Sequence, residues 1–258
     1  YTIGLLSSKI GYSMPLIPDK LTLTTNLRAT YLNFVGLYLR DRYKNLKTDQ
    51  YSNYWFYDTN VKLHYKIDPK NQFYFTFFNG YDNFKRYKRI TIEQEEITKN
   101  IWGSTLFGLR YNRIIKDNFI MNYSIGVNKY KSNIKGNSVL SDDNIGETFK
   151  SSISGLVSQL NFDFLQNKHT LNFGIENKIE DVFPGVYTDF EGVTRIILPN
   201  KKLLTSHAVY VEDIYKLNKT FTIQAGLRYN YLTGSNFNKH LIEPRAQISA
   251  SLSQKDVL

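Results

Sequence analysis

The 258-residue chain contains 15% aromatic residues, with 20 Tyr and 17 Phe, but only 6 Pro and 2 Met, a composition that favours β-strands over helices or disorder. It contains no Cys, which excludes a disulfide framework and any thiolate metal site. The net charge of +10 comes from Lys and Arg scattered along expected turns and loops, and therefore indicates solvated strand ends rather than a nucleic-acid surface.

Targeting and helical membrane-spanning signals are not visible in this sequence. It begins at Tyr1 with no charged segment followed by an apolar one, and we therefore expect an internal fragment of a longer protein. The longest charge-free apolar stretch runs from Ala29 to Leu39, between Arg28 and Arg40. Because a helix needs about 20 apolar residues to cross about 30 Å of hydrocarbon, a helical membrane protein is not expected.

Period-two alternation is the strongest pattern, and it recurs along the chain. In residues 60–67, Val61, Leu63, Tyr65 and Ile67 alternate with polar residues. Because successive side chains of a strand point to opposite faces, such a segment has one apolar and one polar face. The same pattern occurs in residues 119–129, 171–176 and 220–231. Several of these runs extend to roughly fifteen residues, longer than the usual five or six.

Short and long connections alternate between the predicted strands. The short ones are rich in residues that close tight turns. They are Pro15–Lys20, Asp68–Asn71, Lys116–Asn118, Gln166–Lys168, Leu217–Lys219 and Ser253–Asp256. The long ones are polar, with little periodicity, and we expect loops at Asp41–Gln50, Arg89–Asn100, Ile134–Phe149, Asp181–Lys202 and Thr233–His240.

Unequal connections at the two strand ends are typical of transmembrane β-barrels, which have short periplasmic turns, long extracellular loops, an apolar outside and a polar interior. We therefore predict an all-β fold, with residues 1–258 forming part of one transmembrane antiparallel β-barrel. Counting between connections gives about eleven strands and the start of a twelfth at Val257, within a larger barrel of about 22 strands. The alternative is a soluble β-sandwich. The long strand runs and unequal connections of this chain are hard to fit to a sandwich, in which turns recur every 8–12 residues.

The polar faces of the predicted strands carry the candidate site residues. Charged side chains at mid-strand fit a wet lumen and do not fit a dry core. The candidates for facing the lumen or contacting a plug domain are Arg28, Lys62, His64, Glu176, Arg228, Glu243 and Arg245. On the apolar faces, Tyr and Trp near the strand ends, such as Tyr54, Trp55 and Tyr57, predict interfacial girdles.

The C-terminal fifth of the chain resembles the barrel of TonB-dependent outer-membrane transporters of the Bacteroidetes type. The residues that carry this resemblance are His207–Asp213, Gln224–Tyr231 and Glu243–Ala246. Similar hairpin sequences occur at Gly11–Tyr12 and Gly108–Tyr111. The resemblance implies a 22-strand barrel in the bacterial outer membrane, closed by an N-terminal plug. Neither a plug, a TonB-binding segment nor a terminal aromatic residue occurs in this sequence.

The function that the resemblance implies is active, TonB-driven import of a nutrient, with no enzymatic activity. The implied partners are outer-membrane lipid, the TonB energy-coupling complex and an unidentified small-molecule, peptide or glycan substrate, with a surface lipoprotein as an optional further partner. A passive porin or a secretion-associated barrel remains the alternative, and a soluble carbohydrate-binding or hydrolytic β-protein forms a third class.

Catalytic, cofactor and metal motifs are not found. His64, His169, His207 and His240 lack a ligand partner at zinc-site spacing, so lumen, turn or loop positions are expected for them. Glu93, Glu95 and Glu96 lie among basic residues in an expected loop, and the segment Ser141–Asn144 is expected to be a turn because it lacks EF-hand spacing. No cofactor is therefore predicted.

Overall fold

The computed structural model describes residues 1–31, 34, 50–89, 94–140, 143–188, 194–195 and 202–251. Thirteen antiparallel strands form one sheet within these residues. The strands are β1 Thr2–Ile3, β2 Ser7–Ile17, β3 Leu21–Thr30, β4 Gln50–Asp68, β5 Asn71–Arg89, β6 Gln94–Lys116, β7 Phe119–Leu140, β8 Asp143–Gln166, β9 His169–Thr188, β10 Thr194–Arg195, β11 Lys202–Lys216, β12 Phe221–Gly234 and β13 Phe237–Ala250.

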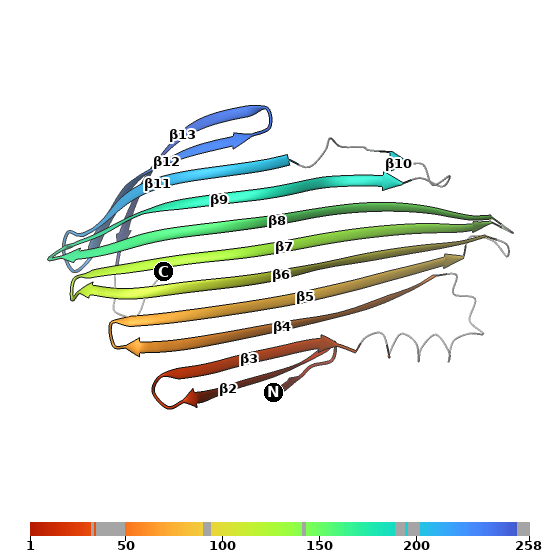
Figure 1. Ribbon diagram of the computed structural model, residues 1–258, viewed down its shortest axis with the longest axis horizontal. Coiled ribbons are helices and arrows are strands. Elements are labelled where there is room, and N and C mark those ends of the chain that lie inside the picture. The colour runs from red at the N-terminus through yellow and green to blue at the C-terminus, as the bar shows by residue number, and fades with distance from the viewer. Residues whose placement is uncertain are drawn as a thin grey trace.

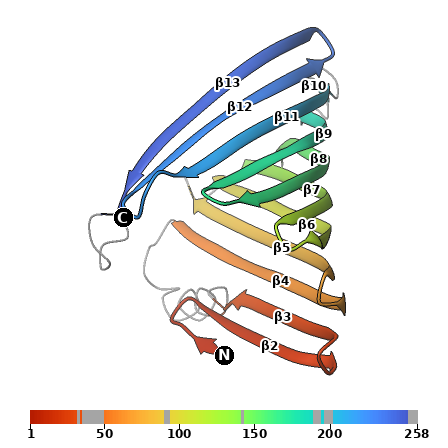
Figure 2. The ribbon, with the colours of Figure 1, turned by 90° about the vertical axis from the view of Figure 1, so that its left-hand side faces the viewer.

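Each long strand pairs with the strands before and after it in the sequence, and β10 adds a short pairing to β9. The sheet curves into a trough whose two edges are formed by β1–β2 and β13 (Figure 2). Eleven strands are ten residues or longer, which confirms the predicted count of about eleven. The start of a twelfth strand at Val257 lies outside the described residues.

Tight turns gather at one end of the trough (Figure 1). Five of the predicted turns are confirmed between β2 and β3, β4 and β5, β6 and β7, β8 and β9, and β11 and β12. Local side chains close two of them: the Asp68 carboxylate accepts hydrogen bonds from the backbone N–H of Lys70 and Asn71, at 2.7 and 2.8 Å. The side-chain oxygen Oδ1 of Asn218 likewise accepts hydrogen bonds from the backbone N–H of Thr220 and Phe221. The turn predicted at Ser253–Asp256 lies outside the described residues.

The predicted long loops are wrong in three places, where strands continue instead. Residues 94–100 belong to β6, and most of Ile134–Phe149 belongs to β7 and β8. In the same way, β12 runs to Gly234 and β13 begins at Phe237. Outside a bilayer both faces of a strand contact water, so alternation disappears from the sequence while the hydrogen-bonded ladder continues.

The remaining loop expectations fall partly outside the described residues. These undescribed parts are residues 41–49 of the first predicted loop, 90–93 of the second, 141–142 of the third, and 189–193 and 196–201 of the fourth. At the fourth loop, the described β9 extends to Thr188, beyond the predicted start at Asp181.

The sheet has no second layer packed on it in the described residues, and Ala208 is the single buried apolar residue among them. Large apolar side chains on one face are open to the surroundings, with Val209 51% and Leu227 49% exposed. This exposure excludes the soluble-sandwich alternative, in which these residues would fill a dry interior.

The polar face is the less exposed of the two. Asn230 is only 6% exposed, whereas Leu227 and Tyr229, on the opposite face of the same strand, are 49% and 38% exposed. Side chains on the inner side of a curved sheet crowd together, whereas those on the outer side spread apart. The polar face is therefore the inner face of the trough, and the apolar face is the outer face.

Candidate functional site

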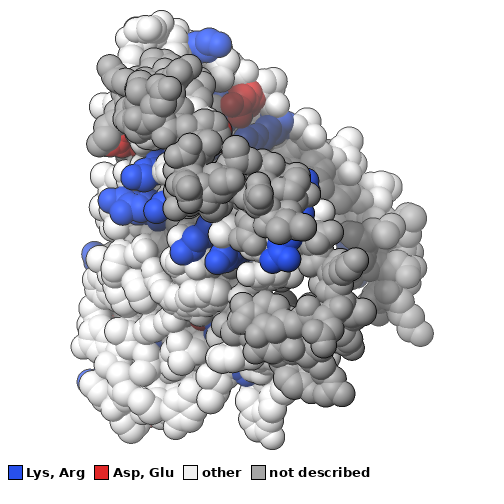
Figure 3. Space-filling view, turned by 90° about the vertical axis from the view of Figure 1, so that its right-hand side faces the viewer, with Lys and Arg blue, Asp and Glu red and all other residues white. Residues whose placement is uncertain are grey.

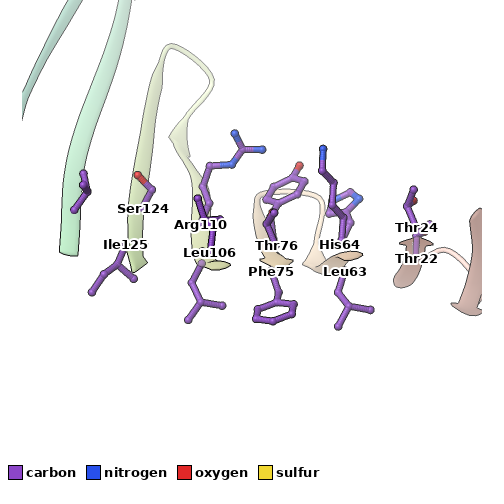
Figure 4. A pocket seen from close by; sticks show the side chains of 16 residues that line it. Thr22, Thr24, Leu63, His64, Phe75, Thr76, Leu106, Arg110, Ser124 and Ile125 are labelled. Atoms are coloured by element: carbon purple, nitrogen blue, oxygen red, sulfur yellow. The ribbon is translucent and has the colours of Figure 1, made fainter. Parts of the chain in front are cut away.

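All seven candidate residues lie on the inner face. Strand register establishes this, because residues directly opposite each other in antiparallel strands share a face. The pairs His64–Tyr74, Tyr74–Arg110 and Arg110–Ser124 continue one inner row. Figure 4 shows His64, Arg110 and Ser124 on one side of the sheet, and Leu63, Phe75 and Ile125 on the other.

An ion pair between β9 and β12 forms the centre of the site. A guanidinium nitrogen of Arg228 lies 2.7 Å from a carboxylate oxygen of Glu176, and the side chains are only 19% and 25% exposed. Strand β11 runs between these two strands, so the pair crosses it. Ala208 is opposite both Glu176 and Asn230 and is 3% exposed. Its small side chain leaves room for the ion pair above it.

The ion pair extends across β12 to β13 through hydrogen bonds. The Arg228 Nε donates to Asn230 Oδ1 at 2.9 Å, and Asn230 Nδ2 donates to Glu243 Oε1 at 2.6 Å. Glu243 also forms an ion pair with Arg245 at 3.3 Å. We call Glu176, Arg228, Asn230, Glu243 and Arg245 the charge network. Its two guanidinium groups balance its two carboxylates.

Tyr210 joins the charge network to β8. The Arg228 guanidinium carbon lies 5.6 Å from the centre of the Tyr210 ring, within the range of cation–π contact. The Tyr210 hydroxyl donates a hydrogen bond to Asn161. The ring passes over Gly174, where an added Cβ atom would lie 2.7 Å from the Tyr210 hydroxyl oxygen. Glycine at this position therefore allows Tyr210 to lie flat along the wall.

Arg28 is separate from the charge network. A guanidinium nitrogen of Arg28 lies 2.6 Å from Asp58, and its guanidinium carbon lies 4.9 Å from the centre of the Phe56 ring. Asp58 is directly opposite Arg28 on β4. The ion pair therefore links β3 to β4 near the N-terminal edge of the wall.

His64 and Lys62 line a wide inner hollow of about 590 Å³, together with Arg110. The His64 ring stacks on the Tyr74 ring, with 4.4 Å between the ring centres, and the His64 Nε2 lies 2.9 Å from Gln72 Oε1. The guanidinium carbon of Arg110 also lies 4.4 Å from the centre of the Tyr74 ring. Lys62 is opposite Thr24 and Thr76. The structure thus brings four of the seven candidates together and leaves three elsewhere on the same face.

Sequence reasoning missed Tyr210, Asp58 and Arg110 as members of the inner face, and it placed Asn230 on the polar face without naming it as a candidate. Asp58 has the same period-two parity as Lys62 and His64 on β4, and alternation along β6 and β11 was the available signal for Arg110 and Tyr210. No group of three or more His, Asp or Glu side chains that could hold a metal ion occurs in the described parts of the chain. No helix within those parts is long and apolar enough to cross a membrane.

Comparison with protein-family profiles gave no match, and comparison with curated proteins gave none either. Solved structures do match. The ferric-catecholate import receptor Fiu from E. coli K12 aligns with a TM-score of 0.59 at 11% identity, over 95% of this chain and 46% of that one. The siderophore receptor PiuA from Acinetobacter baumannii aligns with a TM-score of 0.57 at 9% identity, over 94% of this chain and 44% of that one.

This chain has the fold of an outer-membrane β-barrel wall. The ferric citrate transporter FecA in its unliganded form gives the same result, with a TM-score of 0.57 at 10% identity, over 87% of this chain and 36% of that one. The expected resemblance to TonB-dependent transporters is confirmed at the level of the fold. A wall with this fold lies in the bacterial outer membrane. The chain spans less than half the length of each of these three receptors.

Proposed function

We propose that this chain is part of the barrel wall of an active transporter that imports a nutrient through a plugged outer-membrane barrel. The observation that carries the proposal is the charge network on the inner face. Arg228 and Glu176 are largely enclosed by the wall, whereas Glu243 and Arg245, on the inner face of the edge strand β13, are 42% and 61% exposed. Charged groups left open on an inner wall suit contacts with a polar body inside the barrel.

In this proposal the enclosed half of the charge network makes the wall rigid and the exposed half contacts the plug. The Arg228–Glu176 pair ties β9 to β12 across β11, and this fixes the wall against which a plug would move. Glu243 and Arg245 offer one acceptor and one donor group for hydrogen bonds to a plug. Lys62 and His64, around the wide inner hollow, would line the substrate path.

The partners of this transporter would be the TonB energy-coupling complex, which would pull on the plug, and a small-molecule, peptide or glycan substrate. A surface lipoprotein is a further candidate partner at the loop end. The similar solved structures are named as receptors or transporters, and their names favour transport over catalysis. No enzymatic role is proposed.

Electrical recording separates this transporter from a passive porin. The full-length protein would be reconstituted in a planar lipid bilayer, and binding of the purified periplasmic domain of TonB would be measured in parallel. A plugged transporter leaves the bilayer at its baseline conductance and binds the TonB domain. A steady open-channel current without TonB binding would contradict the proposal.

A further inference from the structure

The outer face changes its chemistry along β7. From the tight turn, the outward side chains of β7 are apolar through Met121, Tyr123, Ile125 and Val127, and the next two are Lys129 and Lys131. A barrel strand needs about 9–11 residues to cross the hydrocarbon. Lys129 and Lys131 therefore lie where β7 leaves the apolar band and enters the headgroup layer of the outer leaflet.

Three more lysines form a row across neighbouring strands beyond this level. Lys85 on β5 is directly opposite Lys99 on β6, and Lys99 is directly opposite Lys135 on β7. Like charges placed opposite each other destabilise a sheet, so this row costs folding free energy unless an anion lies against it. Lys150 on β8 adds a further cation, opposite Asn133.

We call these residues the lysine patch: Lys85, Lys99, Lys129, Lys131, Lys135 and Lys150. Figure 3 faces the loop end and shows Lys and Arg gathered there, with fewer Asp and Glu. In the part of the chain that the structure describes, no lysine of the patch forms an ion pair with a carboxylate. Positive charge therefore exceeds negative charge on this part of the outer face, where Asp181 is a nearby acidic residue.

Two adjoining grooves lie on the outer face beside Lys129. The first, of about 350 Å³, is lined by Lys129, Lys131, Tyr57 and Tyr81 and has Gly103 at its base. A Cβ atom at Gly103 would lie 2.6 Å from the Gly80 carbonyl oxygen, so glycine keeps this base open. The groove thus combines ammonium groups with aromatic rings at the level where the apolar band ends.

The second groove, of about 530 Å³, shares Thr105 and Lys129 with the first. Its other outward residues include Phe107, Val127 and Leu156, which belong to the apolar band, and the acidic residue Asp181. An elongated ligand could therefore hold an anionic group at Lys129 and lay a hydrocarbon chain against Phe107 and Val127.

An aromatic cluster borders the lysine patch on the side of β4. Trp55, Tyr57 and Tyr81 stack within 5.1 to 6.2 Å of one another on the outer face. Tyr and Trp favour the membrane interface because their rings are amphipathic. Trp55 and Tyr57 lie on the outer face, as the predicted girdle requires, whereas Tyr54 points to the inner face, where its hydroxyl donates to Asp82.

We propose that the lysine patch and its two grooves bind a phosphorylated glycolipid of the outer leaflet. Lys129 and Lys131 hold the phosphate groups, the row of Lys85, Lys99 and Lys135 contacts anionic sugars above them, and the apolar groove takes an acyl chain. The inference rests on the outer-membrane position of the proposed transporter and does not depend on a plug or on import.

The test uses native mass spectrometry of the full-length protein in a non-ionic detergent, with lipid A as the probe because it is a phosphorylated, acylated disaccharide. The variant Lys129→Gln with Lys131→Gln removes two cations from the first groove. Its matched control, Lys116→Gln with Lys219→Gln, removes two exposed cations at the tight-turn end. Retention of the barrel is checked for each variant by its heat-dependent shift in gel mobility.

We expect the groove variant to bind lipid A about tenfold or more weakly than the wild type, and the control to bind it equally well. Dephosphorylated lipid A should also bind about tenfold more weakly to the wild type. If the double variant does not keep its barrel, Lys131→Gln alone should weaken binding by about threefold or more.

Equal binding by the groove variant and the wild type would overturn the proposal, and so would equal binding of dephosphorylated lipid A. Full competition by millimolar inorganic phosphate would also overturn it, because the site would then recognise a free anion rather than a lipid. Import and TonB binding are not read in this experiment, so failure of the transport proposal and failure of the lipid proposal give different results.

Discussion

The charge network and the lysine patch are on opposite faces of the wall and differ in how their charges are compensated. In the charge network, Arg228 and Arg245 each have a carboxylate within 3.3 Å. In the lysine patch, Lys85, Lys99 and Lys135 are opposite one another. The comparison indicates that the charges at the centre of the inner face compensate one another, whereas the lysine patch carries an excess of positive charge that an external anion would balance.

The largest effect is expected from breaking the centre of the charge network. Arg228→Met leaves Glu176 enclosed without its partner, and removal of one partner from a largely buried pair is strongly destabilising. We expect the free energy of unfolding of the full-length protein to fall by about 2 kcal/mol. Urea unfolding in detergent, followed by tryptophan fluorescence, measures this change.

The control for Arg228→Met is Arg245→Met, whose guanidinium is 61% exposed and should contribute less than about 1 kcal/mol. A loss at Arg245 equal to the loss at Arg228 would contradict the division of the charge network into an enclosed and an exposed half.

A smaller effect is expected from Gly174→Ala. The new methyl group would meet the Leu160 carbonyl oxygen and the Tyr210 hydroxyl, which displaces Tyr210 from Asn161. We expect a loss of about 1 to 2 kcal/mol in urea unfolding, a typical result of overpacking. The matched control is Gly136→Ala on β7, where an added Cβ meets nothing within 4 Å. Equal stability of the two variants would show that the close approach at Gly174 is not a constraint.

The lysine patch predicts a change of opposite sign. Lys99→Gln removes the central cation of the row and should stabilise the delipidated protein by a few tenths of a kcal/mol. Because salt screens exposed charges, the gain should shrink as NaCl is raised. A destabilising effect at low salt, measured by the same urea titration, would show that the row is already compensated.

The smallest effect concerns the tight-turn end, outside both regions. Hydrogen bonds from Asn71 and from the backbone N–H of Lys70 lower the pKa of Asp68 below its usual 3.8. A lowered pKa in the folded state adds stability above the unfolded pKa, and this stability is lost as the pH falls through the folded value. Below about pH 4, Asp68→Asn should therefore lose less stability than the wild type. Equal losses of stability in Asp68→Asn and the wild type as the pH falls would show that Asp68 does not contribute to the pH dependence.

Much of the wall could be predicted from alternation and turn residues. Apolar and polar faces in residues 119–129 require a strand with two environments, and Asp68 and Asn218 are in sequences that close tight turns. The extensions of β6, β7 and β8 beyond the bilayer could not be predicted, because strands with water on both faces need no alternation.

The composition of the charge network was only partly accessible from the sequence. Parity placed Glu176 and Arg228 on one face, but their contact joins residues 52 positions apart across an intervening strand. This contact depends on the register of β9, β11 and β12 and on the small side chain of Ala208. The lysine row likewise appears only when the registers of β5, β6 and β7 are known.

The assignment of the two faces is tested most directly by spin labels on adjacent residues of β7. Because the sequence contains no Cys, Ser124→Cys and Ile125→Cys each give one labelling site in this part of the full-length protein. In lipid vesicles, the label at position 125 should collide with dissolved oxygen, and the label at position 124 with a water-soluble nickel complex. Equal nickel accessibility at both positions, or the reverse pattern, would contradict a wall with lipid outside and water inside.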